Sequence, residues 1–173
     1  MATLPSATQA TPAHPEVFSP ENLLLMDETV KEVFGVMLGL EVEAHGEVAW
    51  TGDSPVRHEQ TAIVGFAGAL SVICEISVGR AGALAITSAM LGGAEIAAGN
   101  ESVCDAVGEL CNMLAGGWKN RVPLLGAACS LSVPTVIEGV AYQVHRPANA
   151  RLNQRLYQFG ENKLLLTLLF NPR

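Results

Sequence analysis

The chain has 173 residues, of which 49% are hydrophobic and 16% are charged. This length suits one domain with a sizeable core, and the composition differs from the low hydrophobicity and high charge of a disordered chain. The net charge is −7, and the ten Lys and Arg residues do not cluster. A nucleic-acid partner is therefore not expected, because a phosphate backbone is bound by clustered basic residues.

The cysteines and the hydropathy pattern indicate in which cellular compartment the protein is expected. The four cysteines, none of which forms a CxxC pair, are Cys74, Cys104, Cys111 and Cys129. Each lies in an apolar stretch, where a free thiol behaves as a small buried hydrophobe. No window reaches the roughly 18 continuous apolar residues of a membrane span. We expect a soluble, cytoplasmic protein without disulfides.

The start of the chain differs in composition from the rest. Residues 1–19 are rich in Pro, Ala and Thr, and they lack the basic start and apolar run of a secretory signal. We expect a disordered tail over residues 1–19 and a single folded domain over residues 20–173.

Three helices are predicted. Apolar residues at helical spacing predict the first over residues 20–38, ending at Gly39. Its expected inner face consists of Leu23, Met26, Val30, Val33, Phe34, Met37 and Leu38. The second is expected over residues 80–91, before a Gly-Gly pair. The third is expected from about residue 101 to 121, before Pro123.

Strand patterns fill the remaining regions, apart from a polar loop over residues 51–59. The predicted strands are residues 40–49, 61–66, 69–77, 128–133, 135–140, 156–159 and 164–170. The second and third form a hairpin with its turn at Ala67 and Gly68. Helices among consecutive hairpins predict an α/β (α+β) single-domain sandwich, with long helices packed on a mainly antiparallel or mixed β-sheet.

The third helix has one polar face. Its outward-facing residues are predicted to be Glu101, Asp105, Gly108, Glu109, Asn112, Gly116 and Lys119. Asp105, Glu109 and Asn112 follow one another at i, i+4 and i, i+3 steps, so their side chains project together. We call these three residues the ridge.

Two glycines flank the ridge, although a helical Gly costs roughly 0.5–1 kcal/mol relative to Ala. At Gly108 and Gly116 the lack of a side chain would let another backbone approach closely. On spacing alone, however, a solvated outer face is the commoner explanation of such a polar stripe.

A family resemblance favours a functional ridge. The segment AVGELCNMLAG, with SVPTVIEG after it, resembles the signature of the CheX, CheC and FliY chemotaxis phosphatases. That signature is Asp or Ser, three residues, Glu, two residues, Asn, about twenty-one residues and Pro. The residues that match it are Asp105, Glu109, Asn112 and Pro134.

The resemblance extends to TAIVGFAGAL, to SAMLGG and to the order of elements, so that it covers about 150 residues. CheC-type relatives carry a second Glu and Asn pair on the first helix. Here Glu28 is followed at the third place by Lys31, and Glu32 by Gly35. The chain therefore resembles the single-site CheX type.

The resemblance implies a phosphatase that removes the phosphoryl group from the aspartyl phosphate of a CheY-like receiver domain. Asn112 would position the hydrolytic water, and Glu109 would pair with the receiver's lysine. Pro134 would shape a strand or turn beneath the helix. Further residues expected to support the pair or contact the partner are Asp105, Gly108, Gly116 and Lys119.

The receiver would also supply Mg²⁺, so the chain is expected to bind no metal or cofactor, and no Cys or His cluster with ligand spacing is visible. The resemblance also implies a homodimer formed through sheet edges, for which residues 164–170 are a candidate.

Two other functions stay open on the sequence. The first is a docking module of the same fold that binds a receiver or a flagellar motor component without hydrolysis. The second is an acid/base enzyme that uses Asp105 and Glu109 on a small molecule, which would require a concave pocket.

Overall fold

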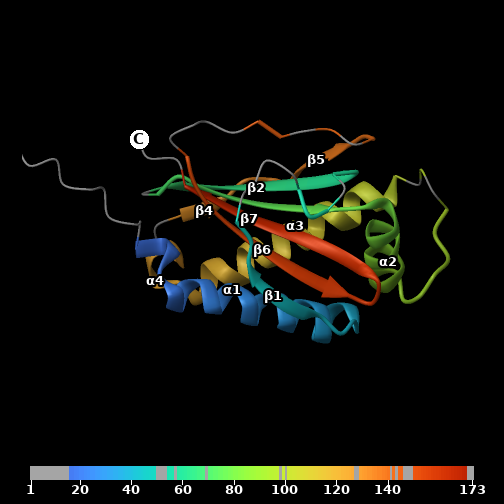
Figure 1. The fold of residues 1–173 in the computed structure, drawn as a ribbon, viewed down its shortest axis with the longest axis horizontal. Helices are drawn as coiled ribbons and strands as arrows, with labels where there is room; N and C mark the ends of the chain where they lie inside the picture. The colour runs from blue at the N-terminus through green and yellow to red at the C-terminus, as the bar shows by residue number, and fades with distance from the viewer. Residues whose placement is uncertain are drawn as a thin grey trace, which may run out of the picture.

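The computed structural model describes residues 16–49, 54–56, 58–68, 70–97, 99, 101–126, 129–140, 142, 144–145 and 150–170. Two long helices, α1 (Pro20–Glu32) and α3 (Ser102–Arg121), lie on one face of a seven-stranded sheet, and α2 (Arg80–Met90) lies at one end (Figure 1). None of the described helices is both long enough and apolar enough to cross a membrane. The predicted α+β architecture is confirmed.

The sheet is antiparallel at every pairing, in the order β1-β6-β7-β3-β2-β4, with β5 also pairing β2. Its strands are β1 (Glu43–Glu47), β2 (Gln60–Gly68), β3 (Val72–Val78), β4 (Cys129–Leu131), β5 (Thr135–Glu138), β6 (Arg151–Phe159) and β7 (Asn162–Phe170). Because β7 lies between β6 and β3, residues 164–170 cannot provide a sheet edge, and that prediction is wrong. The described edges are β1 and the β4 and β5 side.

The same order of a helix, a strand or strand pair and a hairpin occurs twice along the chain, once from α1 to β3 and once from α3 to β7. The second strands of the two hairpins, β3 and β7, pair at the middle of the sheet. The first half's β1 joins the second half's β6, and the second half's β5 joins the first half's β2. This exchange places α1 and α3 side by side on one face.

The last residues of the predicted tail are ordered. Glu16–Phe18 form a short 3-10 helix in which Val17 and Phe18 are buried in the core. The hydroxyl of Ser19 then caps α1 by accepting a hydrogen bond from the N–H of Asn22 at 3.3 Å. The folded part thus begins by residue 16 rather than 20. Residues 1–15 lie outside the described part.

Strand limits differ from the prediction where long-range pairing extends them. The β2–β3 turn lies beyond Gly68, not at Ala67 and Gly68, because these two residues continue β2 by pairing with Ser130 and Cys129 of β4. Strand β6 begins at Arg151 rather than at 156. A short helix, α4 (Pro123–Gly126), was not predicted, and part of the predicted loop over 51–59 lies outside the described residues.

The first helix ends in a π-helical turn, η2 (Val33–Leu38). The carbonyl of Phe34 accepts the N–H groups of Gly39 and, at 2.9 Å, of Leu40, and Gly39 adopts a φ of 65°. This wider turn rotates the following residues about the helix axis. Leu38 stays buried, but Met37 is 62% exposed, so its predicted place in the core is wrong.

A buried polar cluster fastens α1 to β6. The Asp27 carboxylate accepts hydrogen bonds from Arg155 Nε at 2.7 Å and from the Tyr157 hydroxyl at 2.6 Å, and it forms an ion pair with Arg155. Burial and the hydrogen bond to Asp27 raise the pKa of Tyr157 well above its ordinary value.

Helices α1 and α3 approach each other closely at Gly117. A Cβ atom on Gly117 would lie 2.6 Å from Thr29 Cγ2, far inside van der Waals contact. Thr29 cannot easily rotate away, because its hydroxyl donates to the Leu25 carbonyl at 2.7 Å. By contrast, a Cβ atom on the neighbouring Gly116 would lie at an ordinary 3.7 Å from Leu131 Cδ1.

We therefore expect Gly117→Ala to lower the free energy of unfolding by about 1–2 kcal/mol, as overpacking outweighs the gain in helix propensity. Gly116→Ala should raise it by about 0.5–1 kcal/mol. Urea unfolding of the two variants measures both effects. Thr29→Ser, which deletes the clashing methyl group, should restore much of the stability of Gly117→Ala. Equal stability of the two Gly→Ala variants would contradict the close approach.

The raised pKa of Tyr157 predicts a loss of stability at high pH. Because the folded-state pKa exceeds the unfolded value of about 10, the stabilisation is complete below pH 10 and is lost as the pH rises further. The free energy of unfolding of the wild type should then fall more steeply than that of Tyr157→Phe, by up to about 1.4 kcal/mol per pH unit. Urea titrations between about pH 9 and 11 would measure this difference. Parallel curves would contradict it.

Candidate functional site

The ridge lies on the solvent side of α3, as predicted. Asp105 and Glu109 are exposed, and Asn112 is half-buried. Asn112 Nδ2 donates to Glu109 Oε2 at 3.4 Å, so the amide and the carboxylate lie side by side. The opposite side of α3 is buried against the sheet, where Trp118 packs edge-on against Phe66 of β2 with ring centroids 5.8 Å apart.

Gly108 does not belong to the presented face. It is buried, and a Cβ atom there would lie 3.1 Å from Val136 Cγ2 and 3.4 Å from Pro134 Cβ. The groups that approach this glycine are therefore side chains of the chain's own segment at the start of β5, and not the backbone of a partner. Pro134 thus lies against α3, which agrees with its expected structural role.

The other two predicted contact residues also face their own chain. Lys119 Nζ donates to the carbonyl of Gly126 at 2.6 Å and so ties α4 to the end of α3. Gly116 is half-buried beside Leu131. Of the predicted outward face, Glu101, Asp105 and Glu109 are exposed and Asn112 is half-buried, so the ridge keeps its place on the solvent side of α3.

Cys104 occupies the β5 side of α3 and was expected to be an apolar core residue. It is half-buried instead, with Sγ 3.7 Å from Gln60 Oε1 and 3.6 Å from Glu138 Oε2. Burial and the carboxylate of Glu138 raise the pKa of Cys104, so its thiol stays protonated at neutral pH. The sequence neighbours of Cys104 gave no sign of these contacts, which come from two separate strands.

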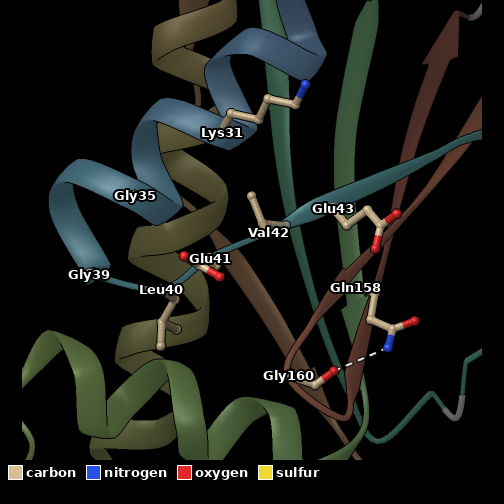
Figure 2. Close-up of a pocket in the computed structure, with 9 residues that line it drawn as sticks. All are labelled: Lys31, Gly35, Gly39, Leu40, Glu41, Val42, Glu43, Gln158 and Gly160. Carbon is tan, nitrogen blue, oxygen red and sulfur yellow. Dashed lines mark hydrogen bonds between the residues drawn. The ribbon is translucent and has the colours of Figure 1, made fainter.

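The corresponding acidic residues of the first helix are arranged differently. Arg121 of α3 forms ion pairs with Glu32 and, at 3.5 Å, with Glu28. Lys31 and Gly35, at the places where an asparagine would follow, line a cavity of about 610 Å³ beside β1 and the β6–β7 turn (Figure 2). No carboxylate and amide pair like that of α3 forms on this helix.

The cavity in Figure 2 does not contain the ridge. Its lining includes Lys31, Glu41 and Glu43, and the one hydrogen bond drawn among its residues joins Gln158 Nε2 to the carbonyl of Gly160 at 3.1 Å. Asp105 and Glu109 lie on a convex helix surface, which does not suit an acid/base enzyme acting on a small molecule. Within the described ranges, no three His, Cys, Asp or Glu side chains come together as a metal site.

The arrangement fits chemistry on a partner that brings its own concave site. A neutral amide can orient a water molecule, and the carboxylate beside it can pair with a cation.

Comparisons with known proteins identify the family of this chain. The family model described as chemotaxis phosphatase CheX matches residues 60–154, a range that contains the whole ridge and Pro134. A curated relative from Thermotoga maritima, named CheY-P phosphatase CheX, is 30% identical over 112 residues, which are 65% of this chain and 69% of the relative.

Solved structures share the fold. The chemotaxis protein CheX from Vibrio vulnificus aligns with a TM-score of 0.76 at 22% identity, over 87% of this chain and 99% of that one. CheX in the CheX-CheY-BeF3-Mg²⁺ complex from Borrelia burgdorferi aligns with a TM-score of 0.66 at 15% identity, over 86% of this chain and 96% of that one.

The family model covers more than half of the sequence. The chain belongs to the CheX family.

Proposed function

We propose that this chain is a response-regulator phosphatase that removes the phosphoryl group from the aspartyl phosphate of a CheY-like receiver domain. The observation that carries the proposal is the pair of exposed Glu109 and half-buried Asn112, which lie side by side at 3.4 Å on α3 of a CheX-family chain. The relative from Thermotoga maritima is named for this activity, and the Borrelia burgdorferi relative was crystallised with CheY, BeF3 and Mg²⁺.

Asn112 would supply the positioning of the attacking water. Its Nδ2 group already donates to Glu109, which leaves the Oδ1 oxygen to accept a hydrogen bond from a water molecule in line with the phosphorus. The water oxygen then bonds to phosphorus as the bond to the aspartyl oxygen breaks, giving inorganic phosphate and the free carboxylate. A neutral amide suits this place because a carboxylate would be repelled by the phosphoryl oxygens.

Glu109 would set the register of the helix on the receiver. One carboxylate oxygen holds Asn112, and the other is available for the lysine of the receiver's active site. This charge-assisted contact gains strength as the interface excludes water. Asp105, one helical turn earlier and exposed, lies where it would contact the edge of the same pocket.

Mg²⁺ would sit on the receiver, beside the phosphorylated aspartate, and not on this chain. The Mg²⁺ of the Borrelia burgdorferi complex is consistent with that place. The proposal also includes a cytoplasmic location and a homodimer, the latter through one of the described edges, β1 or the β4 and β5 side.

The decisive test follows the decay of ³²P-labelled receivers in the presence of Mg²⁺. We expect the wild type to accelerate decay of its receiver, and Asn112→Ala to lose about 10²–10³-fold in rate, because one preorganised polar group contributes about this much. Asn112→Asp should be equally inactive because of its charge. Glu109→Ala should lose about 10–100-fold in kcat/KM, through weaker docking as well as slower hydrolysis.

Glu161→Ala serves as the matched control, because Glu161 is exposed in the β6–β7 turn, away from α3. It should keep the activity of the wild type. If a receiver binds the wild type but its decay rate does not change, the chain is a docking module and not a phosphatase. If decay is accelerated equally by Asn112→Ala, the water-positioning role of the ridge is wrong.

A further inference from the structure

Three exposed apolar side chains lie on the two sides of α3. Val133 is 82% exposed on the β5 side, and Val36 is 76% exposed on the α1 side, where Met37 is also exposed. Contiguous exposed apolar groups next to a polar site are typical of protein interfaces, in which they exclude water from the central contacts.

Val133 lies in a bulge of the sheet edge. Leu131 pairs with Phe66 and Thr135 pairs with Ile63, so three residues of the β4–β5 segment oppose two residues of β2. Such an extra residue re-aims a side chain and is common beside active sites.

The bulge is held firmly. Ser132 donates its backbone N–H to the Gly65 carbonyl at 2.8 Å, and its hydroxyl accepts the Gly65 N–H at 2.9 Å. The same hydroxyl also lies 2.9 Å from the carbonyl of Val133, to which it donates. Val133 is thus presented by a fixed backbone, which lowers the entropic cost of using it as a contact.

The two ends of the bulge contact α3 one turn before and one turn after Asn112. Leu131 lies against Gly116, one turn after Asn112, and Pro134 lies against Gly108, one turn before it. Residues 132 and 133 therefore lie between these two contacts, along the side of α3 from which Asn112 projects.

On the other flank, the π-helical turn η2 has a comparable effect. It too inserts backbone into a regular element, and it turns Met37 towards solvent while Leu38 stays buried. Insertions of this kind occur frequently at functional sites. The turn is the segment between Lys31 and Gly39 in Figure 2.

The α1 flank extends as far as α3. A cavity of about 410 Å³ between the two helices is lined by Val33, Val36 and Met37 from one side and by Met113 and Gly117 from the other. Met113 directly follows Asn112 in the sequence. Methionine side chains adapt their shape readily, which suits a surface that must fit another protein.

We propose that Val133 on one flank, and Val36, Met37 and Met113 on the other, form an apolar rim on which the receiver domain docks around the ridge. This inference rests on the proposed function, because the occupant is the same receiver whose active site Glu109 and Asn112 enter. The rim supplies affinity and excludes water from the Glu109 contact, whereas Asn112 acts on the phosphoryl group. The receiver should accordingly present apolar groups around its own phosphorylation pocket.

The chain offers a matched control for each flank. Val140 is as exposed as Val133, at 80%, but it follows the far end of β5. Leu24 is as exposed as Met37, at 60%, and it lies on α1 outside the cavity between the helices. Because all four side chains face solvent, substitution should not disturb folding, which thermal unfolding would verify.

Binding is measured by titrating each variant with CheY-like receivers loaded with beryllofluoride and Mg²⁺, and KM and kcat are measured with the phosphorylated receiver. We expect Val133→Asp and Met37→Asp to weaken binding and raise KM by about 5–20-fold, with kcat changed less than twofold. Val140→Asp and Leu24→Asp should stay within about twofold of the wild type. The neutral Val133→Ser should weaken binding in the same direction, which separates loss of apolar contact from charge repulsion.

The proposed rim would be contradicted if Val133→Asp and Met37→Asp bound the receiver with wild-type affinity. It would also be contradicted if all four Asp variants lost affinity equally. A loss confined to one flank would overturn the assignment of the other. The binding readout does not require hydrolysis, so weaker binding by the rim variants supports the rim even if the receiver's decay is never accelerated. A wild type that binds no receiver would overturn both proposals.

Discussion

The close packing of α3 between α1 and β5 determines which side chains of α3 reach solvent. On one flank Gly117 meets Thr29, and on the other Gly108 meets Pro134 and Val136, and neither glycine can accept a Cβ atom without displacing its neighbour. Together these contacts fix the rotation of α3 about its own axis. The ridge points outwards because both glycines point at the chain's own elements. The same contact explains why the signature includes Pro134, since this residue fills the space beside Gly108.

Local patterns predicted what depends on local chemistry. The limits of α2 and α3 and the stop at Gly39 followed from apolar spacing, glycines and prolines, and the structure agrees with them. The ridge followed from the same spacing. What could not be predicted depends on residues distant in the sequence. The first half of β6 did not show an apolar strand pattern, because its buried residues include Asn153 and Arg155. The charge of Arg155 is neutralised by Asp27 of α1.

The candidate site was also predicted only in part. Helical periodicity placed Glu109 and Asn112 on one face, and the family resemblance singled them out, but neither could say that Lys119 would hold Gly126 or that Gly108 would be covered by β5. Nor could it place Val133, whose exposure arises from the alignment of β4 and β5 on β2. A periodic pattern predicts on which face of a helix a side chain lies. Which residue packs against that side chain depends on how the strands of the sheet are aligned.

The buried contact of Asp27 with Arg155 and Tyr157 has a consequence for the thermodynamics of association. It joins α1 to β6, and Ser132 joins the bulge to β2. Both flanks of α3 are therefore attached to the same sheet. Such a surface has little conformational freedom to lose when a partner arrives. The entropic cost of ordering in a complex would then arise mainly in the partner, which would adjust its conformation to this surface.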